Sequence, residues 1–133
     1  MKLVVNTNIL FSFFNEKSVA RELATLPDLD LYSPEFSLKE LEKYKQEILE
    51  KFSLNETQHL LTLSLLKTTI KFVKETEYKE ELLKAKQITP DPDDIDFFAL
   101  SLKLNCPIWS NDKKLKNQTE AKILSTKEVI DLI

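Results

Sequence analysis

Polar side chains follow apolar runs at two points of the sequence where strands are expected to end. Asn6 comes directly after the apolar run at residues 3–5, and Ser110 and Asp112 follow a second apolar run at residues 107–109. In open parallel sheets, ligands bind at the edge formed by the carboxyl ends of the strands. These polar groups are therefore candidates for a functional site.

Two groups of carboxylates could reach the same edge from the starts of helices. Two carboxylates about 5 Å apart repel by roughly 3 kcal/mol at an effective dielectric near 20, so a gathered set needs a cation. Oxygen ligands without imidazole or thiolate select Mg²⁺ or Mn²⁺, and such sites activate water during phosphodiester hydrolysis. The two groups are Glu35, Glu40 and Glu42, and Asp91, Asp93, Asp94 and Asp96.

Each of these carboxylates also has a purely structural interpretation. In DPDDID, Asp91 and Asp93 are suited to capping a helix that begins near Pro92. Asp94 is expected at the edge of that helix's buried face, whereas Asp96 is expected to be solvated. Asp112 could serve only to form a turn or cap a short helix at residues 113–116. Glu40 flanks an apolar stripe at helical spacing, formed by Leu38, Leu41, Tyr44, Ile48 and Phe52.

Composition excludes several classes of protein. The chain has no glycine, so it lacks the phosphate-binding loop, the dinucleotide fingerprint and the nucleophile elbow. The only histidine, His59, is expected on a surface or helix face, without a partner for triad chemistry. One cysteine, Cys106, forms no internal disulfide and suits a reducing cytoplasm. No membrane span is expected, and the net charge of -3 means that a nucleic acid would need a local lysine patch.

Apolar runs and helical spacings alternate along the chain. This order predicts an α/β fold with a mostly parallel sheet covered on both faces, in one domain over residues 1–133. Strands one and four should be neighbours, so that Asn6 and Asp112 flank one crevice. Strands are expected at 2–5, 29–32, 69–73, 107–109 and 121–124, and helices at 9–14, 19–26, 34–51, 55–67, 77–86, 93–104, 113–116 and 127–133.

Four sequence blocks together resemble a PIN domain, closest to the small prokaryotic proteins that include the VapC toxins. They are VVNTNIL, SLKELEKY, DPDDIDFFALSLKLNCPIW and SND. The resemblance implies a three-layer α/β/α fold with a five-stranded parallel sheet and Mg²⁺- or Mn²⁺-dependent endoribonuclease activity. It also implies frequent homodimers and, for the toxin branch, an antitoxin partner.

The resemblance assigns roles to individual residues. Asn6, Asp94 and Asp112 occupy the positions of metal ligands, and Glu40 completes the catalytic set. Thr7 and Ser110 would orient these groups or the water.

Asn6 departs from the family pattern, which has Asp at this position. An amide oxygen can still act as a ligand, but the site loses one negative charge. Three interpretations stay open: a naturally weakened nuclease, a natural binding-only PIN domain, and a substitution introduced to silence a toxic enzyme.

Two other function classes are alternatives to a nuclease. A phosphoacceptor receiver domain would need an acidic pair after the first strand and Asp after the third, where Asn6 and Val73 stand instead. A non-catalytic module that binds RNA or protein is a third class. Lys113 and Lys114 border the predicted cleft and could bind RNA phosphates. The aromatic residues Phe11, Phe13 and Phe14 are expected in the core or at a dimer contact.

Overall fold

A five-stranded parallel sheet forms the centre of the protein, in a computed structural model that describes all 133 residues. The strands lie in the order β3-β2-β1-β4-β5, and every neighbouring pair is parallel. This confirms the predicted α/β fold and the predicted adjacency of strands one and four. The strands are β1 (Lys2–Val5), β2 (Asp30–Pro34), β3 (Ile70–Val73), β4 (Ile108–Trp109) and β5 (Ile123–Leu124).

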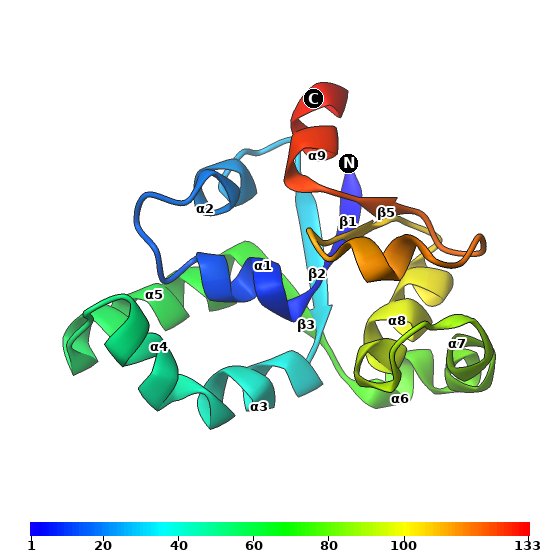
Figure 1. Cartoon of the computed structure of the whole chain (residues 1–133), viewed down its shortest axis with the longest axis horizontal. Helices are drawn as coiled ribbons and strands as arrows, with labels where there is room; N and C mark the ends of the chain where they lie inside the picture. Colours follow the sequence, from blue (N-terminus) through cyan, green and yellow to red (C-terminus); the bar gives the residue numbers. More distant parts are fainter.

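Helices cover both faces of the sheet, as Figure 1 shows. Side chains alternate across each strand, so Leu3 and Val5 of β1 belong to one buried cluster and Val4 belongs to the other. The first face is covered by α1 (Thr7–Ser12), α2 (Val19–Ala24), α3 (Phe36–Lys43), α4 (Lys45–Lys51), α5 (Glu56–Thr69) and α9 (Thr126–Leu132). The second face is covered by α6 (Glu75–Tyr78), α7 (Leu82–Ile88) and α8 (Ile95–Leu104), with short 3₁₀ turns η1 (Lys79–Glu81), η2 (Pro92–Asp94) and η3 (Lys113–Lys116).

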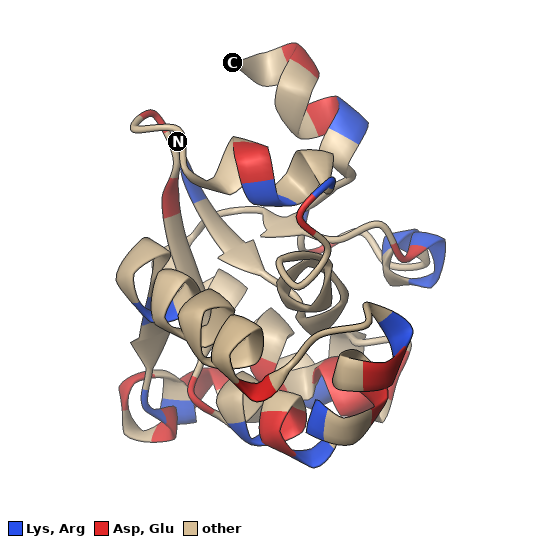
Figure 2. Ribbon diagram, turned by 90° about the vertical axis from the view of Figure 1, so that its left-hand side faces the viewer, with Lys and Arg blue, Asp and Glu red and all other residues tan.

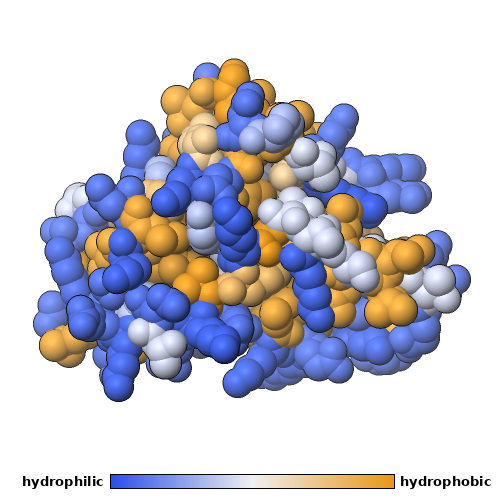
Figure 3. All heavy atoms as spheres, turned by 180° about the vertical axis from the view of Figure 1, so that it is seen from behind, coloured by the Kyte–Doolittle hydropathy of each residue, from blue (hydrophilic) through white to orange (hydrophobic).

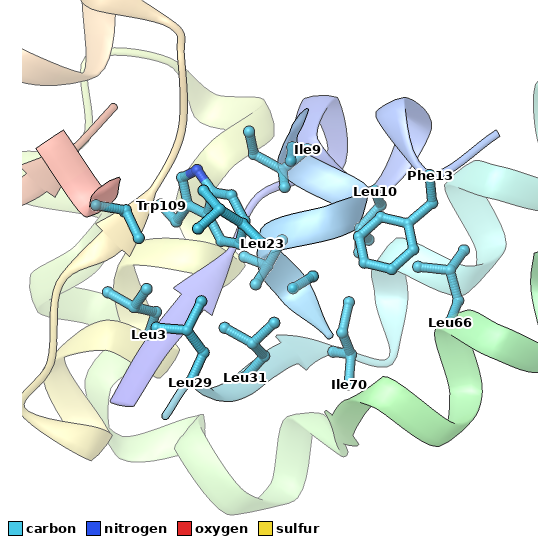
Figure 4. Close-up of a cluster of buried hydrophobic side chains, with 14 of the residues drawn as sticks. Leu3, Ile9, Leu10, Phe13, Leu23, Leu29, Leu31, Leu66, Ile70 and Trp109 are labelled. Carbon is cyan, nitrogen blue, oxygen red and sulfur yellow. The ribbon is translucent and has the colours of Figure 1, made fainter. Parts of the chain in front are cut away.

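Large side chains fill the layer between the sheet and the first group of helices (Figure 4). Trp109 of β4 is fully buried there, and its indole N–H donates to Thr126 Oγ1 over 3.0 Å, which fixes the start of α9 against the sheet. Phe13 and Phe14 also lie in this core and are packing residues. Phe11, the third of the aromatic residues expected in the core or at a dimer contact, is half-buried.

Three predicted helices are broken up or begin differently in the structure, and the ends of several others shift by one or two residues. The helix expected at residues 34–51 is two helices, because Tyr44 has φ -100° and ψ 13° and bends the chain between α3 and α4. The helix expected at 77–86 is α6, η1 and α7, and the helix expected from Asp93 starts as the 3₁₀ turn η2. Asn105 ends α8 in the left-handed conformation (φ 52°), a position that usually takes glycine.

His59 lies on a helix, one of the two places expected for it, but it is not at the surface. The residue lies on α5 but is only 5% exposed, and its ring stacks on Phe14 with centroids 5.1 Å apart and planes 22° apart. Its Nε2 atom is buried without a hydrogen-bond partner. Burial, followed by the nearby charge of Lys45, lowers the pKa of the imidazole.

Figure 3 shows apolar side chains between the hydrophilic ones, with a group at the end where α9 finishes. Exposed apolar residues there include Ile130, Leu132 and Ile133. No helix of the chain is both long and apolar enough to span a bilayer.

We expect His59→Phe to remove part of the acid sensitivity of folding. Because the folded pKa of His59 is lowered, protonation favours the unfolded chain, so its stabilising contribution is complete above the unfolded pKa near 6.5 and is lost as the pH falls. The free energy of unfolding from urea titrations should therefore fall more between pH 7.5 and 5.5 in the wild-type chain than in the variant. Parallel pH profiles would contradict the prediction.

Candidate metal centre

A backbone hydrogen bond links the ends of β1 and β4. The Asn6 N–H donates to the Trp109 carbonyl over 3.2 Å, so the residues that follow both strands emerge side by side. Asn6 is only 4% exposed and caps α1, because its Oδ1 accepts the N–H of Asn8 over 3.0 Å. This contact leaves the Nδ2 amino group as the remaining polar atom of the side chain.

Glu40 is held in the same region by the first residue of α1. Thr7 Oγ1 donates to Glu40 Oε1 over 2.7 Å, and both side chains are half-buried. Burial raises the pKa of Glu40, the Thr7 hydrogen bond opposes this shift, and the charge of Asp93 adds to it. The contact supports the predicted orienting role of Thr7, which stays a prediction.

Asp94 has the most strongly raised pKa among these carboxylates. It ends η2 and is half-buried, and its pKa is raised to about 6, first by burial and then by repulsion. The repelling charges are those of Asp91, Asp112, Asp93 and Glu40. The negative groups from three separate parts of the chain therefore share one electrostatic environment.

Asp112 stabilises a turn and also belongs to the candidate site. Its Oδ1 accepts the N–H of Lys114 over 3.0 Å and caps η3, as the structural interpretation predicts. The buried Ser110 hydroxyl accepts the Asp112 N–H over 3.1 Å and fixes this turn. Lys113 and Lys114 are exposed beside it and are not part of the wall of the cleft.

A cleft of about 260 Å³ brings these side chains together. Five of its ten lining residues are carboxylates, and no Lys, Arg or His lines it. In Figure 2 the charged segments are densest in the lower half of the molecule, toward which the strands run. The lining residues are Asn6, Thr7, Asn8, Phe11, Glu40, Tyr44, Asp91, Asp93, Asp94 and Asp112.

The donors fit a hydrated divalent ion better than a closed protein cage. No group of three or more Asp, Glu, His or Cys side chains is close enough to hold a metal ion by itself. Mg²⁺ usually keeps several waters and is bound through one or two carboxylates. Burial is the main cause of the raised pKa of Asp94, and the repulsion from neighbouring carboxylates that adds to it is what a cation would neutralise.

Among the neighbouring carboxylates, Asp96 differs from expectation and Asp91 has the capping role expected of it. Asp96 was expected to be solvated, but it is half-buried and its Oδ2 accepts the Tyr78 hydroxyl over 2.6 Å. Asp91 does cap η2, since its Oδ1 accepts the Asp93 N–H over 3.0 Å. Glu35 and Glu42 are exposed and lie outside the cleft.

Sequence reasoning missed the two aromatic residues of the cleft as site residues. Phe11 was assigned to the core or a dimer contact, and Tyr44 was read as part of an apolar helix stripe. The apolar stripe alone carried no signal for the bend that takes Tyr44 into the cleft.

Comparisons with known proteins agree with this architecture. A sequence model described as PIN domain matches residues 4–129. The chain belongs to the PIN domain family. A chain in the crystal structure of VapBC2 from Rickettsia felis, bound to a DNA fragment from its promoter, has a similar fold: the TM-score is 0.62 and the identity 16%, over 94% of this chain and 98% of that one. No curated protein matches this PIN domain in sequence.

We expect Asp94→Asn to stabilise the metal-free protein. The folded pKa of Asp94 is raised, so the ionised carboxylate destabilises the fold progressively as the pH rises from about 4 through 6. With EDTA at pH 7.5 the variant should unfold with a free energy about 1 kcal/mol higher, after allowance for solvent screening. The gain should vanish at pH 3.5.

The exposed Asp28→Asn is the matched control for this comparison. An equal gain from both substitutions, or a gain for Asp94→Asn that does not depend on pH, would contradict the electrostatic explanation.

Proposed function

We propose that this PIN domain is a Mg²⁺- or Mn²⁺-dependent endoribonuclease whose activity is reduced by Asn6. Members of the family are generally ribonucleases. The observation that carries the proposal is the cleft at the strand ends, which is lined by five carboxylates and by no basic side chain. The chain would act as a single domain, in the cytoplasm, where RNA is available.

The residues divide into those that would hold the ion and those that would handle protons. Asp94 and Asp112 would be the charged ligands, with Asn6 as the third position. A divalent ion held there would activate a water as the nucleophile and stabilise the charge on the phosphoryl oxygens. Glu40 keeps one carboxylate oxygen beyond the one held by Thr7, and its raised pKa suits it to accept a proton from water. Ser110 would keep Asp112 in position.

Asn6 weakens this site in a specific way. Its single oxygen already accepts the N–H of Asn8, so only the second lone pair of that oxygen is left for an ion, and the adjoining Nδ2 donor repels a cation. An aspartate could cap the helix with one oxygen and offer the second to the ion. The same observation supports a second candidate, a catalytically inactive PIN domain that binds RNA or protein.

The biological context rests on resemblance. The similar Rickettsia felis structure is a VapBC2 assembly with promoter DNA. By analogy we propose that this chain is the toxin of a toxin-antitoxin pair, or an RNA-processing nuclease, that forms homodimers and binds an antitoxin protein.

The decisive substitution is Asn6→Asp. The added carboxylate should increase Mn²⁺ affinity at least about tenfold and RNA cleavage about 10- to 100-fold, because affinity depends on ligand charge. Calorimetric titration of Mn²⁺ and gel assays of a mixed structured RNA measure the two effects. Asn6→Asp with Asp94→Ala should lose both gains.

A control separates the site from a general charge effect. Asn55 also caps a helix through its side-chain oxygen, outside the cleft, so Asn55→Asp makes the same chemical change elsewhere. If Asn6→Asp neither binds Mn²⁺ nor cleaves RNA, the catalytic proposal is wrong and the binding module becomes the better account.

We expect Lys113 and Lys114 to contact RNA phosphates. Replacing both by Ala should weaken RNA binding and reduce the slope of log affinity against log salt by about 1.4, since each lost phosphate contact contributes about 0.7 for a single strand. Fluorescence anisotropy between 50 and 200 mM salt measures this slope. Lys103→Ala, an exposed lysine of α8, is the control, and an equal loss there would contradict the assignment.

A further inference from the structure

A buried tyrosine holds the first turn of α8, next to the acidic cleft. Tyr78, the last residue of α6, is fully buried in the second core cluster, and its hydroxyl donates to Asp96 Oδ2 over 2.6 Å. Burial, followed by the Asp96 hydrogen bond, raises the pKa of Tyr78, so the hydroxyl keeps its proton and stays a donor. Hydrogen bonds to a carboxylate are shorter and stronger than those between neutral groups, so this contact links α6 firmly to α8.

Asp96 lies two residues after Asp94, whose side chain has no anchor of its own at the start of the helix. Asp94 is the N-cap of α8, but its carboxylate makes no capping hydrogen bond. The direction of this side chain therefore depends on its backbone, which leaves the 3₁₀ turn η2 and enters α8 at this residue. The contacts that fix the backbone on both sides of Asp94 thus also fix its carboxylate in the cleft.

Two hydrogen bonds made by side chains hold the backbone around Asp94, one on each side. On the N-terminal side, Asp91 Oδ1 accepts the N–H of Asp93 over 3.0 Å. On the C-terminal side, the Tyr78–Asp96 bond ties the first turn of α8 to α6, which lies beside α8 in Figure 1. The rest of α8 is anchored by buried residues of its own. The Tyr78 hydroxyl therefore acts on the turn that carries Asp94 and not on the whole helix.

We propose that Tyr78 and Asp96 are positioning residues of the candidate metal centre, and that their hydrogen bond holds the Asp94 carboxylate in the cleft. The inference rests on the proposed nuclease function, which makes Asp94 a metal ligand. Neither Tyr78 nor Asp96 lines the cleft, so both act through Asp94. Partners that orient the ligands of a metal site typically weaken metal binding by about 10- to 100-fold when they are lost.

The test compares Tyr78→Phe with its parent protein in two measurements. The first is Mn²⁺ affinity by calorimetry in the Asn6→Asp protein, which Tyr78→Phe should lower about tenfold. The second is the backbone order parameter of Asp94 and Ile95 from NMR relaxation of the metal-free wild-type chain, which should fall from about 0.85 toward about 0.6 in the variant. The order parameter of Phe98 should not change, because this residue is fully buried in the core.

Matched variants separate positioning from a general loss of stability. Tyr32→Phe removes the same kind of bond, from the Tyr32 hydroxyl to Asp30 Oδ2 over 3.0 Å at the start of β2, and should change neither measurement. Asp96→Asn keeps an oxygen that can accept from the Tyr78 hydroxyl and should stay close to the parent, whereas Asp96→Ala should behave like Tyr78→Phe. Thermal melts establish that each variant is folded, and Asp96→Ala takes the place of Tyr78→Phe if the latter does not fold.

The outcomes separate this inference from the nuclease proposal. Unchanged order parameters or an unchanged Mn²⁺ affinity in the folded variant overturn the positioning role, and so does an equal effect of Tyr32→Phe. If Asn6→Asp itself does not bind Mn²⁺, the proposed metal site is wrong, whereas the order parameters of the metal-free chain still decide whether Tyr78 positions Asp94.

Discussion

One backbone hydrogen bond, from the Asn6 N–H to the Trp109 carbonyl, is the constraint on which the site depends. It joins the ends of β1 and β4, so the cap of α1 and the turn at Asp112 start from neighbouring points. Trp109 is buried beneath this junction and is tied to α9 through Thr126, which makes the edge part of the core. The side chains of the cleft are therefore positioned by the sheet itself.

Repulsion among the carboxylates destabilises this arrangement, and the same repulsion would favour binding of a cation. Local roles hold the acidic groups in place: Asp91 caps η2, Asp112 caps η3 and Glu40 accepts from Thr7. Each role uses one oxygen of its carboxylate and leaves the other for a ligand. Capping and ion binding are thus compatible here, and the structural interpretation of these residues does not argue against the functional one. Asn6 is the exception, since its single oxygen serves the cap.

The sequence was sufficient to predict the sheet and to predict that the main site residues lie close together. Apolar runs identify the five strands, and strand adjacency in this architecture brings Asn6 and Asp112 together. It was insufficient where contacts between distant elements decide the outcome. His59 is buried because Phe14, 45 positions earlier, stacks on it, and Asp96 is held by Tyr78, 18 positions earlier. Local polarity contains no information about such partners, and none about the bend that takes Tyr44 into the cleft.

The most direct test of the central claim is to locate the ion. Crystals of the wild-type chain and of Asn6→Asp, soaked in Mn²⁺, would show anomalous scattering at each bound manganese. The account predicts a peak in Asn6→Asp within coordination distance of residue 6 and Asp94 or Asp112, and a weaker peak or none in the wild type. Strong peaks only outside the cleft, or equal occupancy in both proteins, would contradict the claim that Asn6 limits a metal centre at the strand ends.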